Sequence, residues 1–159
     1  MELCFQKVKN EGAFDFFEAD EELAAGRMTQ LSFENKFLIS LMDYSFRYTT
    51  RKDYLLSDQF LEVLSFESVQ AESWEYGFGK FPLMAGVTTY INQRRQGKLV
   101  FLPDTPVRGI RIMIFEEFYL QYLKQRFDDY LDVDGLIKMN HKSYCIPELQ
   151  LVLKQIKRS

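Results

Sequence analysis

The residues of this chain that are best suited to chemistry are aromatic rings and one arginine, all on stretches with the two-residue periodicity of β-strands. Tyrosine and tryptophan carry polar atoms that a closed core has to satisfy with hydrogen bonds. A small-molecule site needs apolar walls and a few polar groups, so several such rings turned inward together predict a pocket. The residues that we assign to this pocket are Tyr44, Phe46, Tyr48, Trp74, Tyr76, Tyr90, Arg111 and Met113. The alternative, in which each ring only fills the core, stays open.

Arg111 is the charged residue of this set. It shares one face of a predicted strand with Val107, Gly109 and Met113, so its neighbours are apolar. A guanidinium in such a place can hold the carboxylate or phosphate of a ligand through two parallel hydrogen bonds. Two other interpretations remain open for Arg111, namely an internal ion pair and an edge position in solvent.

Metal and nucleophile chemistry find little support in the sequence. The chain has one histidine, His141, whereas an iron, manganese or zinc site of the usual kind needs several imidazole ligands. His141 and Cys145 are one helical turn apart, but catalytic dyads are normally assembled from distant segments. The chain also has no glycine-rich phosphate loop. We therefore expect a metal-free domain that uses no cofactor and is not an enzyme.

The composition predicts one soluble domain. Its 159 residues are enough for a sizeable core, and 47% of them are hydrophobic. The net charge of −3 argues against direct binding of nucleic acid, because phosphate neutralisation needs a basic surface. The two cysteines, Cys4 and Cys145, lie far apart, and neither a signal peptide nor an apolar run long enough to span a bilayer is present. We expect a cytoplasmic protein.

Alternating stretches separated by short turns predict an antiparallel β fold. The expected strands are Arg27–Phe33, Phe37–Tyr48, Gln59–Ser68, Glu72–Phe78, Val87–Asn92, Lys98–Leu102 and Val107–Phe115, with a weaker edge strand at residues 2–9. The acidic and aromatic segment 12–25 is predicted as a short helix or covering loop. This arrangement favours a sandwich or a small barrel of the jelly-roll type.

Helices are predicted after the strands. Glu116–Leu131 has apolar residues at spacings of three and four, and Pro147 opens a second helix that runs to Lys157. The apolar stripe of this second helix consists of Leu149, Val152, Leu153 and Ile156. Its narrow width favours a dimer seam across a twofold axis over packing back onto the first helix.

Several of these motifs together resemble a known family. They are Gly86-Val87, Tyr90-Ile91-Asn92, Phe101-Leu102-Pro103, the run from Pro106 to Arg111, Glu116-Glu117-Phe118-Tyr119 and the helix at Pro147–Arg158. From about Gly26 onward the chain is similar to the amino-terminal sensor domain of AraC-type bacterial transcription regulators, closest to the siderophore-responsive subgroup.

The resemblance implies a cupin-like ligand-sensing barrel with an amino-terminal arm at residues 1–115 and a helical dimerisation segment at residues 116–159. It implies a homodimer that binds a small organic effector, and a helix-turn-helix DNA-binding domain that we do not expect in this chain. Two alternatives remain: a metal-independent cupin-fold isomerase or lyase, and a protein-interaction module with a filled barrel.

Overall fold

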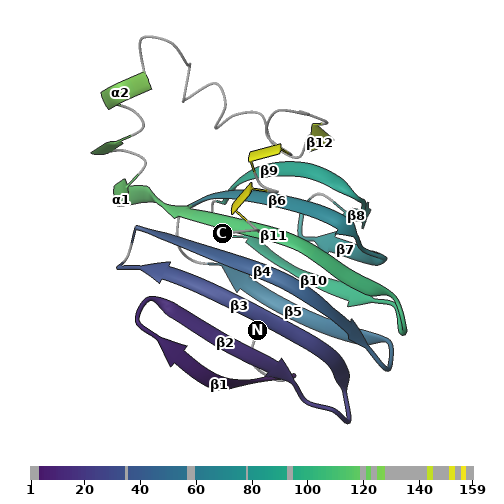
Figure 1. Cartoon of the computed structure of the whole chain (residues 1–159). Helices are drawn as coiled ribbons and strands as arrows, with labels where there is room; N and C mark the ends of the chain where they lie inside the picture. The colour runs from purple at the N-terminus through teal and green to yellow at the C-terminus, as the bar shows by residue number, and fades with distance from the viewer. Residues whose placement is uncertain are drawn as a thin grey trace.

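The computed structural model describes residues 4–34, 36–56, 60–77, 79–92, 95–118, 121–122, 125–127, 143–144, 151–152 and 155–156. Its strands are β1 (Phe5–Glu11), β2 (Phe14–Ala19), β3 (Ala24–Phe33), β4 (Phe37–Phe46), β5 (Thr50–Leu56), β6 (Phe60–Ser68), β7 (Ala71–Glu75), β8 (Gly79–Leu83), β9 (Gly86–Asn92), β10 (Arg95–Phe101), β11 (Pro106–Phe115) and β12 (Ser143–Tyr144). Two short helices, α1 (Glu116–Phe118) and α2 (Gln125–Phe127), follow β11. The fold is therefore mainly β, as predicted (Figure 1).

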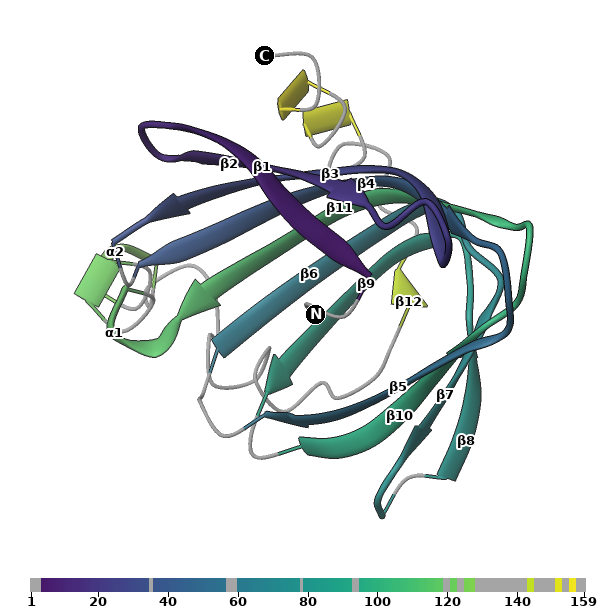
Figure 2. The same ribbon diagram turned by 90° about the horizontal axis from the view of Figure 1, so that it is seen from below.

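The strands form two antiparallel sheets. Sheet A has eight strands in the order β1-β2-β3-β4-β11-β6-β9-β12, and sheet B has four in the order β5-β10-β7-β8. No hydrogen-bonded strand pair joins the two sheets in the part of the chain that is described, so the predicted barrel is not closed. Figure 2 shows sheet B facing sheet A and diverging from it, away from the side where β4 continues into β5.

The sheets meet in an apolar cluster at the side where the chain crosses between them. Phe46 at the end of β4 and Phe101 at the end of β10 have ring centroids 5.1 Å apart. The buried members of the cluster are Ala24, Met42, Phe46, Phe66, Val69, Ala71, Phe101 and Val107. The face of sheet A that carries this cluster is called the inner face below.

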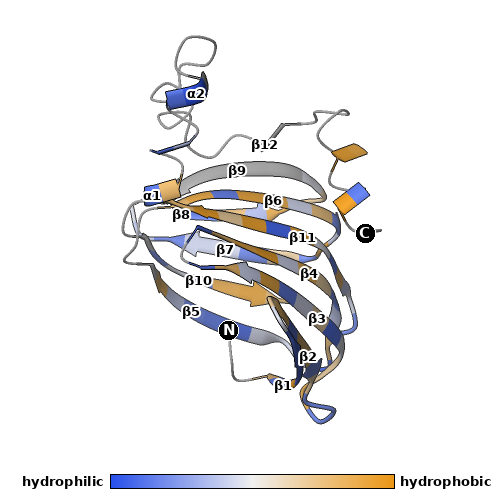
Figure 3. Ribbon diagram, turned by 60° about the vertical axis from the view of Figure 1, so that its left-hand side comes forward, coloured by the Kyte–Doolittle hydropathy of each residue, from blue (hydrophilic) through white to orange (hydrophobic). Residues whose placement is uncertain are grey.

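The outer face of sheet A is apolar near its centre. Ile110 is buried there among Ile39, Leu41, Val63 and Ile112, and Ile156 packs on the same group. Because successive residues of a strand point to opposite faces, β4, β6 and β11 each contribute side chains to both faces of sheet A. Figure 3 shows the alternation of polar and apolar residues along the strands.

The structure corrects the prediction for segment 12–25. It is not a helix or a loop, because β2 pairs with both β1 and β3. Strands β5 and β8 were not predicted either. β5 carries charged residues on both faces, including Arg51 and Lys52, and β8 contains Pro82, so neither shows clear apolar alternation.

The described helical residues fall within both predicted helices. α1 and α2 lie inside Glu116–Leu131, and Leu151, Val152, Gln155 and Ile156 are helical within Pro147–Lys157. The rest of both segments lies outside the described residues. No helix of the described part is long and apolar enough to cross a lipid bilayer.

We predict that Gly26 is needed for the pairing of β3 with β4. Its φ is +112°, and a Cβ there would lie 2.3 Å from the Asp43 carbonyl oxygen. Gly26→Ala should lower the free energy of unfolding by about 3 kcal/mol, since backbone strain and overpacking act together. Gly12→Ala is the matched control, because Gly12 has a φ of +64° but an added Cβ would meet nothing within 4 Å. Equal losses for the two variants in urea unfolding would contradict this account.

Candidate functional site

A row of polar side chains crosses sheet A from strand to strand. Asn10 pairs with Asp15, Asp15 with Gln30, Gln30 with Ser40, and Ser40 with Arg111. Residues directly opposite in neighbouring strands share one face of the sheet. In β4 this is the inner face, because Met42, two residues after Ser40, belongs to the apolar cluster. These five residues are called the polar row.

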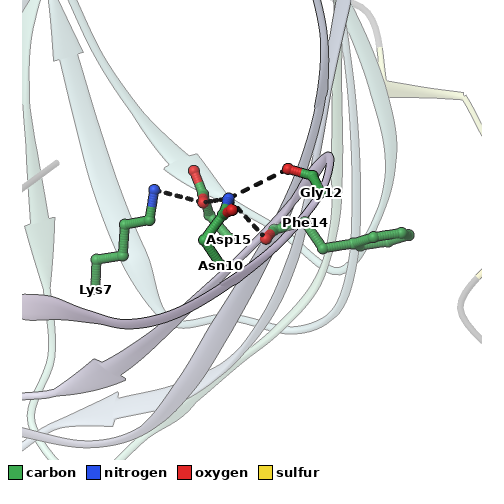
Figure 4. A network of polar contacts seen from close by, with 5 residues as sticks. All are labelled: Lys7, Asn10, Gly12, Phe14 and Asp15. Carbon is green, nitrogen blue, oxygen red and sulfur yellow. Dashed lines mark hydrogen bonds and ion pairs between the residues drawn. The ribbon is translucent and has the colours of Figure 1, made fainter.

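The β1–β2 end of the polar row is held by a local network, drawn in Figure 4. The Lys7 ammonium lies 2.5 Å from Asp15 Oδ1, and Asn10 Nδ2 donates to the same oxygen at 2.7 Å. Asn10 also donates to the carbonyl oxygens of Gly12 and Phe14, so it bridges the hairpin turn. The hydrogen bonds from Lys7 and then from Asn10 lower the pKa of Asp15, which keeps this carboxylate charged.

The other end of the row is an ion pair. Arg111 Nε donates to Glu62 Oε1, and the side chains are only 17% and 7% exposed. Next to it, Gln30 Nε2 donates to the buried Ser40 hydroxyl at 3.3 Å. The internal ion pair considered for Arg111 is confirmed, and the edge position in solvent is wrong. Among the described residues, however, the terminal nitrogens of Arg111 have no hydrogen-bond partner.

Tyr44 lies on the inner face of β4, four residues after Ser40, within the electrostatic influence of Arg111. Burial raises the pKa of its hydroxyl from 10.0 to about 12, against the opposing effect of the positive charge of Arg111. The Tyr44 ring contacts Phe5 of β1, with centroids 4.8 Å apart, and Phe46, at 5.4 Å. The Tyr44 hydroxyl therefore stays neutral and can donate a hydrogen bond at neutral pH.

The structure does not bring all the predicted pocket residues together. Phe46 and Met113 are buried, and Met113 pairs with Glu62. Tyr48 lies beyond the end of β4 and is 65% exposed. The backbone of Tyr90 pairs with that of Glu62, but the Tyr90 side chain is outside the described residues.

Trp74 and Tyr76 occupy the opposite face from the one that we predicted. Strand β7 buries Ala71, Ser73 and Glu75, so Trp74 turns to the outer face of sheet B, and Tyr76 just after it is 77% exposed. The two rings contact each other at 6.5 Å, and the Lys98 ammonium lies 5.2 Å from the Trp74 ring centroid. The contacts of Trp74 with Tyr76 and Lys98 shield part of its apolar surface on the outside.

Glu62, Ser40 and Gln30 are not among the pocket residues predicted from the sequence. A signal for two of them was present. Glu62 stands between Phe60 and Leu64 on the apolar face of its strand, and Ser40 similarly stands between Leu38 and Met42. A polar residue at an inward position of an apolar face has to find a partner, which predicts a buried polar contact.

The predicted dimer stripe is divided in the structure. Ile156 packs on the outer face of sheet A, beside Ile110. Leu151 and Val152 are exposed, and Leu149 and Leu153 lie outside the described residues. Within the part of the chain that is described, no group of three or more His, Cys, Asp or Glu side chains is placed to hold a metal ion.

No protein-family model matches this chain, and no curated protein matches it. Function therefore has to be inferred from the geometry of the polar row, the Glu62–Arg111 pair and Tyr44.

We predict strong coupling between Glu62 and Arg111. Removing either partner leaves a buried charge unpaired, so Glu62→Met or Arg111→Met should each lower the free energy of unfolding by roughly 3–5 kcal/mol. The double variant should recover most of that loss. Asp43 and Arg108 are the control pair, since they interact at 3.0 Å with both side chains about half exposed. Their coupling should stay below about 1 kcal/mol in the same urea experiments. Additive effects at Glu62 and Arg111 would contradict a direct buried pair.

We predict a loss of stability at alkaline pH that depends on Tyr44. Because its pKa is raised on folding, its contribution is complete below pH 10 and is lost as the pH rises to about 12. At pH 12 the loss should amount to about 2 kcal/mol relative to Tyr44→Phe, which cannot ionise. Urea unfolding of both proteins from pH 8 to pH 12 measures this difference. Parallel curves would show that the hydroxyl is not buried.

Proposed function

We propose that this domain is the effector-sensing part of an AraC-type bacterial transcription regulator in the cytoplasm. In this proposal the fold is cupin-like, with the helical segment at residues 116–159 following the strands. The observation that carries the proposal is Arg111: a nearly buried guanidinium with Nε held by Glu62 and both terminal nitrogens unengaged by the described residues.

The chemistry of the site suits a small organic molecule with an anionic group. Glu62 orients the guanidinium through Nε, which leaves the terminal nitrogens to donate to a carboxylate or phosphate oxygen. The neutral Tyr44 hydroxyl adds a donor. The Gln30 amide oxygen supplies an acceptor, because its amide nitrogen is used by Ser40. The buried Met42 and Met113 lie on the same face of sheet A, two residues along from Ser40 and Arg111, and supply apolar surface there.

The contact between Phe5 and Tyr44 supports a sensing role. Phe5 belongs to the amino-terminal strand β1, and its ring packs on Tyr44. An effector that binds Arg111 and Tyr44 more tightly in one placement of β1 shifts the population toward that placement. DNA binding is then a property of a helix-turn-helix domain that responds to this shift.

We predict that small organic acids stabilise the protein through Arg111. In a thermal-shift screen of aliphatic and aromatic acids, each tested beside its uncharged amide, at least one acid should raise the Tm while its amide does not. Arg111→Lys should weaken that binding at least tenfold, because an ammonium keeps the charge beside Glu62 but loses the fork of donors.

Arg51→Gln is the matched control, since Arg51 is an exposed arginine of sheet B, paired with Asp53. Its response should equal that of the wild type. The proposal is wrong if no acid gives a shift, or if Arg111→Lys binds the active acid as well as the wild type does.

A further inference from the structure

A row of alternating charges crosses the outer face of sheet A. Glu18 of β2 pairs with Arg27 of β3, Arg27 with Asp43 of β4, and Asp43 with Arg108 of β11. Each position is offset by an odd number of residues from the polar row, so these side chains point away from sheet B. With strands about 4.8 Å apart, the row is about 14 Å long. These four residues are called the charged row.

The charged row borders a groove of about 760 Å³. The residues that line the groove include Ala25, Ser45 and Pro106, which follow one another in register on β3, β4 and β11. Their small side chains allow another molecule to approach the sheet closely. Arg47 lines the groove as well, and its Nε donates to the Glu21 carbonyl oxygen at 2.6 Å.

The charges of the row are only partly used within the chain. Arg108 Nε lies 3.0 Å from Asp43 Oδ1, and both side chains are about half exposed. Arg27 stands between Glu18 and Asp43 but forms no ion pair with any residue that the structure describes. Glu18 likewise has no ion pair among those residues. With respect to the part of the chain that is described, both charges are free to pair with a partner.

The order of the charges indicates which kind of partner would have complementary charges. Read from β2 to β11, the row is negative, positive, negative, positive, and reading it backwards inverts every sign. A uniformly charged partner, such as a nucleic acid, would meet as many like charges as opposite ones. A second copy turned by a twofold axis that runs along the strands, through the middle of the row, meets only opposite charges, because it pairs residue i with j and j with i.

We infer that this face of sheet A is a homodimer interface, with the twofold axis running along the strands between β3 and β4. Glu18 then faces Arg108 of the partner subunit, and Arg27 faces Asp43 of the partner subunit. An axis along the row would instead place like charges together.

The interface continues onto the helical segment that carries Ile156, since Ile156 packs on Ile110, two residues after Arg108 on the same face. The exposed Leu151 and Val152 of that segment supply apolar surface for the same contact.

Two substitutions of opposite sign test this geometry by sedimentation equilibrium. The wild type should dimerise reversibly in 50 mM NaCl and about tenfold more weakly in 500 mM NaCl, because exposed charges are screened. Arg27→Glu and Asp43→Arg should each be monomeric where the wild type is dimeric, since each places like charges opposite each other. A 1:1 mixture of the two should restore a heterodimer, in which the new carboxylate faces the new guanidinium.

Arg51→Glu is the control for altered surface charge, because Arg51 is exposed on sheet B. It should dimerise as the wild type does. Glu18→Arg and Arg108→Glu form a second complementary pair, which keeps the test decisive if Asp43→Arg does not fold.

The inference is overturned by any of three results: a wild type that stays monomeric at low salt, folded charge variants that dimerise unchanged, or mixtures of folded variants that form no heterodimer. Dimerisation that Val152→Asp abolishes but the charge variants leave intact would place the interface on the helix alone.

Discussion

The two faces of β11 determine most of what this domain can do. The strand pairs along its length with β4 on one side and β6 on the other, so it is fixed at the centre of sheet A. Its residues then alternate between two environments. Val107 and Arg111 face inward to the apolar cluster and the Glu62 pair, whereas Arg108 and Ile110 face outward to the charged row and the helical segment. A one-residue slip in register would exchange these surfaces completely.

The Glu62–Arg111 pair carries a desolvation cost within this arrangement. Apolar residues of similar volume are often at least as stabilising as a buried ion pair, because both charges lose their hydration. Stability alone therefore does not account for a buried ion pair in this place. The polar row leads from this pair across β4 and β3 to the Lys7–Asp15 contact. It thereby connects the inner face with the edge of the sheet.

The sequence predicted the strands whose apolar residues alternate and the inward position of Arg111. The prediction from the sequence failed at β7, where the more hydrophobic face of the strand is not the buried one. In β7 the alternation of Trp74 with Ser73 and Glu75 is visible in the sequence, but the inward face is the polar one. Which face of β7 turns inward depends on the side chains of sheet A that face it and on Lys98 of the neighbouring strand β10. A local sequence pattern contains no information about either. The polar partners of Arg111 are equally non-local, since Glu62 lies 49 residues away.

The irregular pairing of β1 has a consequence for solubility. β1 is an edge of sheet A, and its register with β2 shifts between Lys7 and Lys9. An unprotected edge strand offers unpaired backbone groups to any other chain and is a starting point for fibrous aggregation. A bulge between two lysines, with Lys9 bound to Glu11 as well, makes the addition of a further strand unfavourable. The protein can therefore expose broad sheet faces to solvent without growing by strand addition at this edge.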